Sequence, residues 1–284
     1  VMANVSRALG SPFNIWGEQS DSLAQRDTGW LQLYCENNQE VLDTAIQCFK
    51  IAEEVLLPVM LVLDAFTLSH TAEAVDIPEQ SLVDRFLPRY RPKLRLDPAE
   101  PRSFATLAPP EYLMEFRYKM QEAMLQSKDI VRRVDEEFGE VFGRKYGLVE
   151  AYRCEGADVI MVTSGSVAGT ARVVVDGLRE KGRNVGLVKV RLFRPFPKDE
   201  LLEMVRDAEK VAVLDRSLSL GIGGFFAHEM RAAFCNEAKH PPIFSYITGL
   251  GGRDVTSQML NEVFYRTFES PAPPEKSVWI GMRS

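Results

Sequence analysis

The pattern of apolar and polar positions in the second half of the chain repeats a strand followed by a helix. Four continuous apolar runs predict buried strands at residues 159–163, 185–190, 211–214 and 243–247. Segments with helical periodicity follow these runs at residues 168–181, 198–208, 224–238 and 256–269. Buried strands that alternate with helices are typical of parallel sheets covered on both faces. We therefore predict a doubly wound α/β domain.

Strand and helix also alternate at the start of the chain. Residues 1–5 and 56–63 are apolar runs that predict strands, and residues 38–54 form an amphipathic helical pattern between them. Residues 6–30 are rich in Gly, Ser, Asp and Pro, which predicts a long loop. The first strand begins without a capping or turn residue, so we expect further sequence upstream of Val1.

The middle of the chain has a different composition. Seven of the 16 prolines lie within residues 78–110, which predicts an extended arm, and residues 111–142 carry the apolar stripe of a long packing helix. Basic residues alternate along the arm at Arg89, Arg91, Lys93 and Arg95. They form either a solvated basic face or a contact to an acidic partner or a phosphorylated cofactor. We expect four segments, with bounds at 1–77, 78–143, 144–269 and 270–284.

Composition narrows the class of protein. The 284 residues are 45% hydrophobic and 26% charged, with a net charge of −6, which is typical of a globular protein and argues against a general nucleic-acid binder. No apolar run is long enough to span a bilayer, and no signal peptide is visible. The four cysteines are scattered without a Cys-x-x-Cys pair, so we expect no iron–sulfur cluster in this chain and a cytoplasmic location.

A candidate for ligand binding follows the first strand. Ligands of open α/β sheets bind outside the carboxyl ends of the strands, and Arg7 stands at such an end. A guanidinium can hold a carboxylate through two parallel hydrogen bonds. An ion pair within the loop is the alternative role for Arg7. Two turns that precede helices, at residues 163–166 and 221–224, could bind an anion or serve only as tight turns.

Several motifs resemble one known family. The stretch Asn14-Ile-Trp-Gly-Glu-Gln-Ser-Asp-Ser-Leu-Ala-Gln-Arg-Asp-Thr-Gly-Trp30 closely resembles a loop of the alpha subunits of 2-oxoacid:ferredoxin oxidoreductases, above all those acting on pyruvate. Residues 57–60, 64–70, 188–196 and 213–216 are similar to further family motifs. The resemblance runs from about residue 1 to residue 281. We name residues 6–30 the signature loop.

The resemblance implies both a fold and a substrate site. The fold is a pyrimidine-type thiamine diphosphate-binding domain, truncated at its N-terminus, followed by a doubly wound domain like the C-terminal domain of transketolase. Ser6-Arg7-Ala8 matches the family sequence whose arginine binds the substrate carboxylate. Asp21, Arg26 and Asp27 belong to the signature, and they either lock the loop or support the site. The family's catalytic glutamate and a substrate-side threonine would lie upstream of Val1, so no catalytic residue is assigned here.

The resemblance also implies cofactors and partners. Thiamine diphosphate with Mg²⁺ would be shared with a beta subunit, and [4Fe-4S] clusters would lie on other subunits, with gamma and delta subunits completing the assembly. The reaction would convert a 2-oxoacid and coenzyme A to acyl-coenzyme A and CO₂, with electrons passing to ferredoxin. Pyruvate is favoured, and phenylglyoxylate, oxalate and 2-oxoglutarate are alternatives. A non-catalytic scaffolding subunit is the rival class. Arg191 and Arg194 are expected to be structural, and no metal site is expected.

Overall fold

The strands of the protein form two sheets. The computed structural model describes residues 1–92, 94–105 and 107–283. The first sheet has the strand order β1-β3-β2-β7, and all its pairs are parallel except that of β2 with β7. The bounds of its strands are Met2–Ser6 (β1), Leu31–Tyr34 (β2), Val59–Asp64 (β3) and Leu192–Arg194 (β7).

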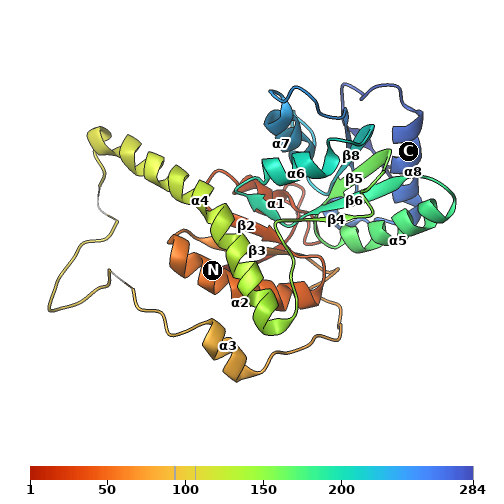
Figure 1. Ribbon diagram of the computed structural model, residues 1–284. Coiled ribbons are helices and arrows are strands. Elements are labelled where there is room, and N and C mark those ends of the chain that lie inside the picture. Colours follow the sequence, from red (N-terminus) through yellow and green to blue (C-terminus); the bar gives the residue numbers. More distant parts are fainter. Residues whose placement is uncertain (93, 106, 284) are drawn as a thin grey trace.

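The two faces of the first sheet have different neighbours. Helices α2 (Asn38–Val55) and α4 (Pro110–Phe142) cover one face and pack against each other (Figure 1). The opposite face buries Tyr34 and Met60 in one apolar cluster with Phe193 and Phe226 from the second half of the chain. Because this cluster includes side chains from both sheets, the two halves share a continuous core.

The second sheet has the strand order β10-β9-β8-β5-β6-β4, in which only β4 is antiparallel to its neighbour. Its strands are β4 (Val149–Tyr152), β5 (Val159–Thr163), β6 (Val185–Val190), β8 (Lys210–Asp215), β9 (Ile243–Ile247) and β10 (Val278–Trp279). Its helices are α5 (Val167–Glu180), α6 (Lys198–Val205), α7 (Phe225–Phe234) and α8 (Ser257–Glu269).

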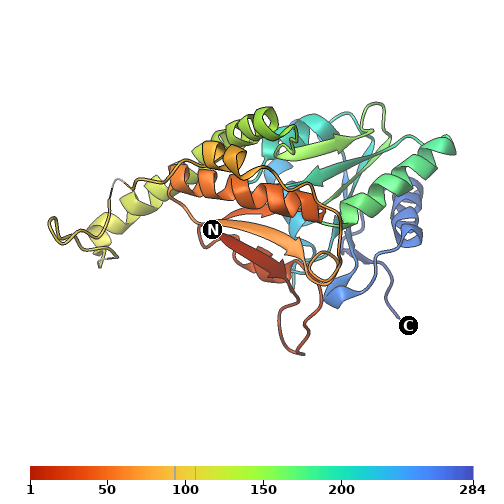
Figure 2. The same ribbon diagram turned by 90° about the horizontal axis from the view of Figure 1, so that it is seen from below.

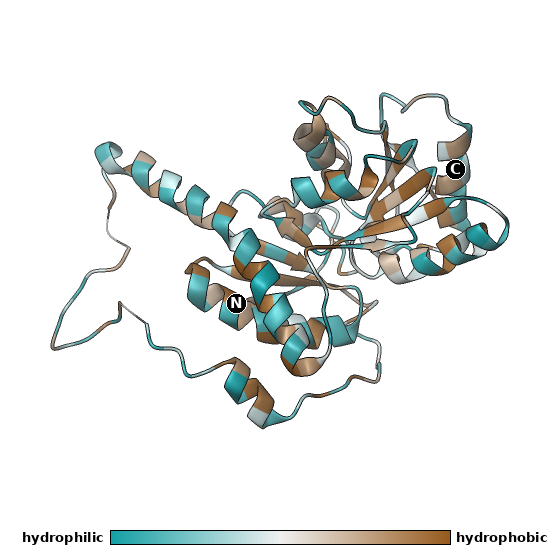
Figure 3. Cartoon of the chain, viewed as in Figure 1, coloured by the Kyte–Doolittle hydropathy of each residue, from teal (hydrophilic) through white to brown (hydrophobic). Residues whose placement is uncertain are grey.

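Helices cover both faces of this sheet, which confirms the predicted doubly wound fold. Residues of α5 and α8 pack on one face, and residues of α6 and α7 pack on the other. The strands appear as continuous hydrophobic segments inside these layers (Figure 3). All four strands predicted for this half are present, because a run of apolar side chains can be buried only where helices cover both faces.

Several short elements were not predicted from the sequence. Strand β7 has three residues and follows β6 after a single residue, so its apolar positions merged with those of β6 in the pattern. It nevertheless pairs with β2 in the other sheet. Helices α1 (Ser20–Ala24) and α3 (Gln80–Phe86) are too short for helical periodicity to show. The predicted segment bounds stay predictions, and the pairing of β7 shows that the two halves are interleaved.

Helix α4 confirms the predicted long helix and has two different parts. Its C-terminal part buries Val131, Val134 and Phe138 against α2 and the first sheet. Its N-terminal part projects away from the body and continues into the arm (Figure 1). Lys93, one of the alternating basic residues, lies outside the described residues. No helix within the described ranges is both long and apolar enough to cross a membrane.

The substitution of phenylalanine by alanine should have very different effects on stability in the two parts of α4. Phe138 is completely buried, whereas Phe116 is 53% exposed. Phe138→Ala should lower the free energy of unfolding by about 3–5 kcal/mol, because it leaves a cavity in a packed core. Phe116→Ala should change it by less than about 0.5 kcal/mol. Denaturant unfolding of the purified chain measures both values, and equal effects would contradict this division of the helix.

Candidate active site

The signature loop leaves the carboxyl end of β1 and returns to it. Arg7 and Gly17 form an isolated antiparallel bridge, and the backbone N–H of Ala8 donates to the carbonyl oxygen of Trp16 at 3.1 Å. The tip of the loop between these points projects from the body (Figure 2). It carries the exposed apolar side chains Leu9 and Phe13, which are 54% and 87% accessible. The chain then enters the short helix α1.

Asp21 in α1 fixes the start of this loop. Its Oδ1 accepts the Ser6 hydroxyl at 2.5 Å and the backbone N–H of Ser22 at 2.6 Å. Its Oδ2 accepts the backbone N–H of Arg7 at 2.9 Å. Ser6 itself is buried and also donates to the carbonyl oxygen of Glu18. The backbone of Arg7 is therefore held on both sides of its Cα by the carboxylate of Asp21 and the bridge to Gly17.

The side chain of Arg7 is free within the described part of the chain. Arg7 is exposed, and its guanidinium makes no hydrogen bond or ion pair with any described residue. The alternative that Arg7 forms an ion pair within its own loop therefore finds no partner in the described ranges. A fixed backbone with a free guanidinium at the carboxyl end of a strand suits the binding of an anionic group.

Arg26 and Asp27 lie elsewhere, at the contact with the second half of the chain. The Nε of Arg26 lies 3.5 Å from Glu229 of α7 and 3.6 Å from Asp27, and its guanidinium stacks over the ring of Phe225. Arg194 also binds Glu229, at 2.6 Å. The structure thus brings Ser6, Arg7 and Asp21 together and places Arg26 and Asp27 in a separate cluster that joins the loop to α7.

Asp64, at the end of β3, joins the two halves of the chain. Its Oδ2 accepts the backbone N–H of Ser166 at 2.8 Å and the Ser166 hydroxyl at 2.5 Å. It also forms a buried ion pair with Arg216, in which the Nη1–Oδ2 distance is 3.1 Å. A Cβ atom on Gly165 would lie 2.8 Å from the same carboxylate oxygen, so this turn requires glycine. The suspected anion site at residues 163–166 is occupied by a carboxylate of the chain itself.

The second suspected anion site is filled in the same way. Asp215, at the end of β8, accepts the backbone N–H groups of Phe226 and Ala227 at the start of α7, at 2.8 and 3.2 Å. A Cβ atom on Gly224 would collide with this carboxylate. Burial raises the pKa of Asp215 to about 6, although these N–H groups and Ser217 oppose the shift. Both glycine turns thus accommodate internal aspartates at helix N-termini.

Arg191 is structural, as expected. It is completely buried, its Nη2 donates to Thr44 and Gln47 at 3.0 Å, and its Nε lies 3.3 Å from Glu40. Lys189 on β6 also reaches Glu40, at 3.1 Å. These groups bind the start of the second half to α2, and none of them faces the signature loop.

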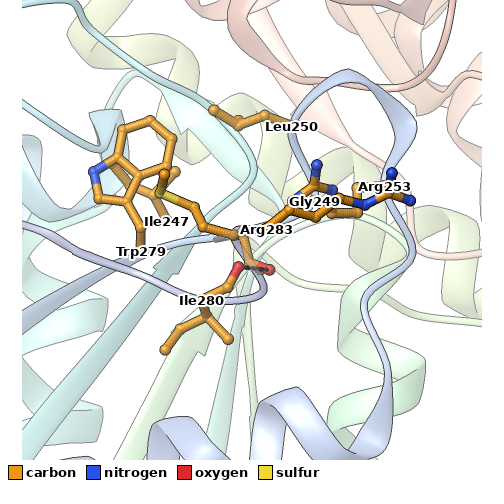
Figure 4. A pocket seen from close by; sticks show the side chains of 9 residues that line it. Ile247, Gly249, Leu250, Arg253, Trp279, Ile280 and Arg283 are labelled. Carbon is orange, nitrogen blue, oxygen red and sulfur yellow. Dashed lines mark hydrogen bonds between the residues drawn. The ribbon is translucent and has the colours of Figure 1, made fainter.

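A separate pocket of about 270 Å³ lies at the carboxyl ends of β9 and β10 (Figure 4). Ile247, Trp279 and Ile280 form apolar walls, and Arg253 and Arg283 contribute guanidinium groups. Arg253 donates to the carbonyl oxygen of Gly281 at 2.5 Å. This guanidinium therefore fastens the C-terminal segment to the second sheet.

The chain offers little to a metal ion. Among the described residues, no group of three or more His, Cys, Asp or Glu side chains could hold one. Cys35 and Cys48 are buried, Cys154 is partly buried and Cys235 is exposed, and none forms a disulfide.

The two halves together define a class of protein. A mostly parallel sheet joined to a doubly wound domain is the arrangement that the family resemblance led us to expect for a thiamine diphosphate-dependent enzyme. The family model for pyruvate flavodoxin/ferredoxin oxidoreductase, thiamine diphosphate-binding, matches residues 1–136. The model for pyruvate:ferredoxin oxidoreductase core domain II matches residues 157–260.

Individual relatives agree with these models. The chain is 48% identical over 286 residues to pyruvate synthase subunit PorA of Methanothermobacter thermautotrophicus, covering all of this chain and 73% of that protein. It is 46% identical over 258 residues to ketoisovalerate oxidoreductase subunit VorA of Pyrococcus horikoshii, covering 90% of this chain and 66% of that protein. The 2-oxoglutarate:ferredoxin oxidoreductase of Magnetococcus marinus shares the fold, with a TM-score of 0.65 at 18% identity, over 93% of this chain and 48% of that one.

The chain belongs to the 2-oxoacid:ferredoxin oxidoreductase family, as an alpha subunit. The expected family and fold class are thereby confirmed.

Asp215 predicts a specific pH dependence of stability. Because its pKa rises from the ordinary value of 3.8 to about 6 in the native state, the native protein holds a proton that the unfolded chain has released between these values. The free energy of unfolding should therefore fall as pH rises through this window, by up to about 3 kcal/mol. Asp215→Asn lacks this titration.

Denaturant unfolding of the wild type and of Asp215→Asn from pH 4 to pH 7 measures the difference. All other titrating groups contribute equally to both proteins, so the wild type should lose stability relative to the variant as pH rises. Parallel profiles would show that Asp215 is ionised throughout.

Proposed function

We propose that this chain binds the carboxylate of pyruvate through Arg7 in a thiamine diphosphate-dependent 2-oxoacid:ferredoxin oxidoreductase. The observation that carries the proposal is the free guanidinium of Arg7 on a backbone fixed by Asp21, at the open edge of the first sheet. Pyruvate is favoured because PorA proteins of several archaea match the whole chain at 42–48% identity. The full reaction would convert pyruvate and coenzyme A to acetyl-coenzyme A and CO₂, with two electrons passing to ferredoxin.

The residues of this chain fit one part of the cofactor's surroundings. The edge near Arg7 offers a cation and exposed apolar side chains, which suit a substrate carboxylate and an organic ring. The described residues offer no cluster of carboxylates for the Mg²⁺ of the diphosphate. The diphosphate and its metal would therefore be held by a partner beta subunit. When bound, thiamine diphosphate supplies the carbanion chemistry and the sink for the electrons of decarboxylation.

Arg7 and Asp21 would orient the substrate in this chemistry. A bidentate guanidinium fixes the plane of the carboxylate and thereby the direction of the bond to the 2-oxo carbon. Asp21 anchors the backbone N–H of Arg7, so the side chain pivots from a fixed point. Asp21 holds both Ser6 and Arg7, and through them it would position the substrate. Proton transfers would fall to groups on other parts of the enzyme.

The other components belong to the assembly. We propose that [4Fe-4S] clusters on other subunits, including a delta subunit, pass electrons to ferredoxin, and that beta and gamma subunits complete a cytoplasmic enzyme. Phenylglyoxylate, oxalate and 2-oxoglutarate stay alternatives, because Arg7 would bind the carboxylate common to all 2-oxoacids. A purely scaffolding role would leave the free guanidinium of Arg7 without a purpose.

Arg7→Ala tests the proposal in the reconstituted complex. The loss of charge-assisted hydrogen bonds of about 1.5–3 kcal/mol should lower kcat/KM for pyruvate by roughly 10–100-fold. Arg7→Lys should recover only part of the loss, because an ammonium lacks the planar fork. Thiamine content should stay normal, since the diphosphate would be held elsewhere.

Arg206→Ala is the matched control. Arg206 is also exposed, but it lies at the end of α6, in the second half of the chain. Its removal should leave kcat/KM unchanged. An unchanged kcat/KM in Arg7→Ala at normal thiamine occupancy would show that another residue binds the carboxylate.

A further inference from the structure

The projecting part of α4 exposes apolar side chains without any cover from this chain. Every residue from 110 to 121 is exposed. Large apolar side chains account for half of this stretch, namely Tyr112, Leu113, Met114, Phe116, Tyr118 and Met120, with accessibilities from 38% to 80%. Figure 3 shows that this part of the helix stands clear of the body. Short helices without tertiary packing are marginal in water, and exposed apolar patches mark interaction surfaces.

The exposed residues continue a packing stripe that is used further along the same helix. Val131, Val134 and Phe138 pack against α2 within the body. Going back along α4 in steps of three and four, the same stripe passes through Met124 and Met120 to Phe116 and Leu113. Beyond the body no described element covers it, so a second helix placed alongside would continue the packing that α2 begins.

A hollow of about 390 Å³ lies at the base of this stripe. Its walls combine Met120 and Met124 of α4 with Leu57, and three guanidinium groups surround them, those of Arg26, Arg117 and Arg194. Glu229 and Asp27 neutralise Arg26 and Arg194. Arg117 forms no ion pair with any residue in the described ranges. An acidic side chain entering the hollow would find an unneutralised guanidinium beside an apolar floor.

Charge decides what kind of helix would fit. Arg117 and Lys119 flank the stripe, whereas Glu111 and Glu115 lie on the far side of the helix. Two copies of this chain paired along the stripe would bring like charges together. The surface is therefore complementary to an acidic partner.

We infer that the stripe Leu113–Phe116–Met120 and the hollow at its base form a docking site for an acidic amphipathic helix of another subunit. The partner's apolar face would cover the stripe, and an acidic residue would bind Arg117. The inference rests on the proposed function only in taking the partner from the same enzyme assembly.

The complete complex, purified with its native subunits, provides the test. Leu113→Glu combined with Phe116→Glu places acidic groups on a stripe that faces an acidic partner. Loss of two central apolar anchors should weaken association of one partner subunit by about 30-fold or more. Arg117→Glu should weaken it by about tenfold at low salt, and added salt should narrow the difference from the wild type, because it screens the repulsion between like charges. Mass photometry on serial dilution of the complex measures subunit release directly.

Val173→Glu is the matched control, because Val173 is 66% exposed on α5 in the second half of the chain. It should release no subunit. Because Leu113 and Phe116 are exposed, the double variant should unfold like the wild-type chain. This result would exclude misfolding as the cause of subunit release. Association as tight as in the wild type would overturn the inference. So would a variant that separates two copies of this chain while every other subunit stays bound.

The measurement is independent of catalysis. If Arg7→Ala left kcat/KM unchanged, the proposed substrate contact would fail while the subunit-release result stood. If the α4 variants released no subunit while Arg7→Ala was impaired, only the docking site would fail.

Discussion

The rest of this structure depends on the contact that the Asp64 carboxylate makes between the two halves of the chain. Asp64 stands at the carboxyl end of a strand in the first sheet, yet its Oδ2 accepts hydrogen bonds from Ser166 and forms an ion pair with Arg216 of the second domain. All three groups lie where the carboxyl ends of strands from the two sheets meet, and Asp64 and Arg216 are almost fully buried. Removing one member of such a buried pair leaves an uncompensated charge, which typically costs about 3–5 kcal/mol. This buried pair therefore helps to fix the relative position of the two halves at the carboxyl ends of their strands, together with the apolar core that they share.

This contact also determines which edge is open to a ligand. The crevice of a doubly wound sheet is the usual place for a ligand, but here Asp64 and Asp215 occupy the N-termini of α5 and α7. The open position lies instead at the end of β1, where Arg7 is held by Asp21 and presents its guanidinium. Under the proposed function, the second domain would dock and support, and the first sheet would present the substrate contact.

The sequence predicted the regular parts of this picture, and the substrate-binding role that it suggested for Arg7 stays a prediction. Long apolar runs and the α4 stripe were sufficient, because their periodicity follows directly from burial. Arg7 could be found because a family motif surrounds it. The role of Asp64 could not, since Ser166 lies 102 residues away, Arg216 lies further still, and only the folded chain brings them together. Strand β7 was missed for a similar reason: three residues carry too little pattern, and the pairing with β2 is set by the other sheet. The glycines of the two turns could be read from the sequence. The sequence did not reveal that internal aspartates fill these turns.

The most direct test of this account is a structure of the assembled enzyme with a bound 2-oxoacid. We expect the substrate carboxylate within hydrogen-bond distance of the Arg7 guanidinium, thiamine diphosphate between the first sheet and a partner subunit, and the Asp64 contact to Ser166 and Arg216 intact. A substrate carboxylate bound at Ser166 and Arg216 with Asp64 displaced would contradict the account. A cofactor held wholly within a partner, far from residues 6–21, would contradict it as well.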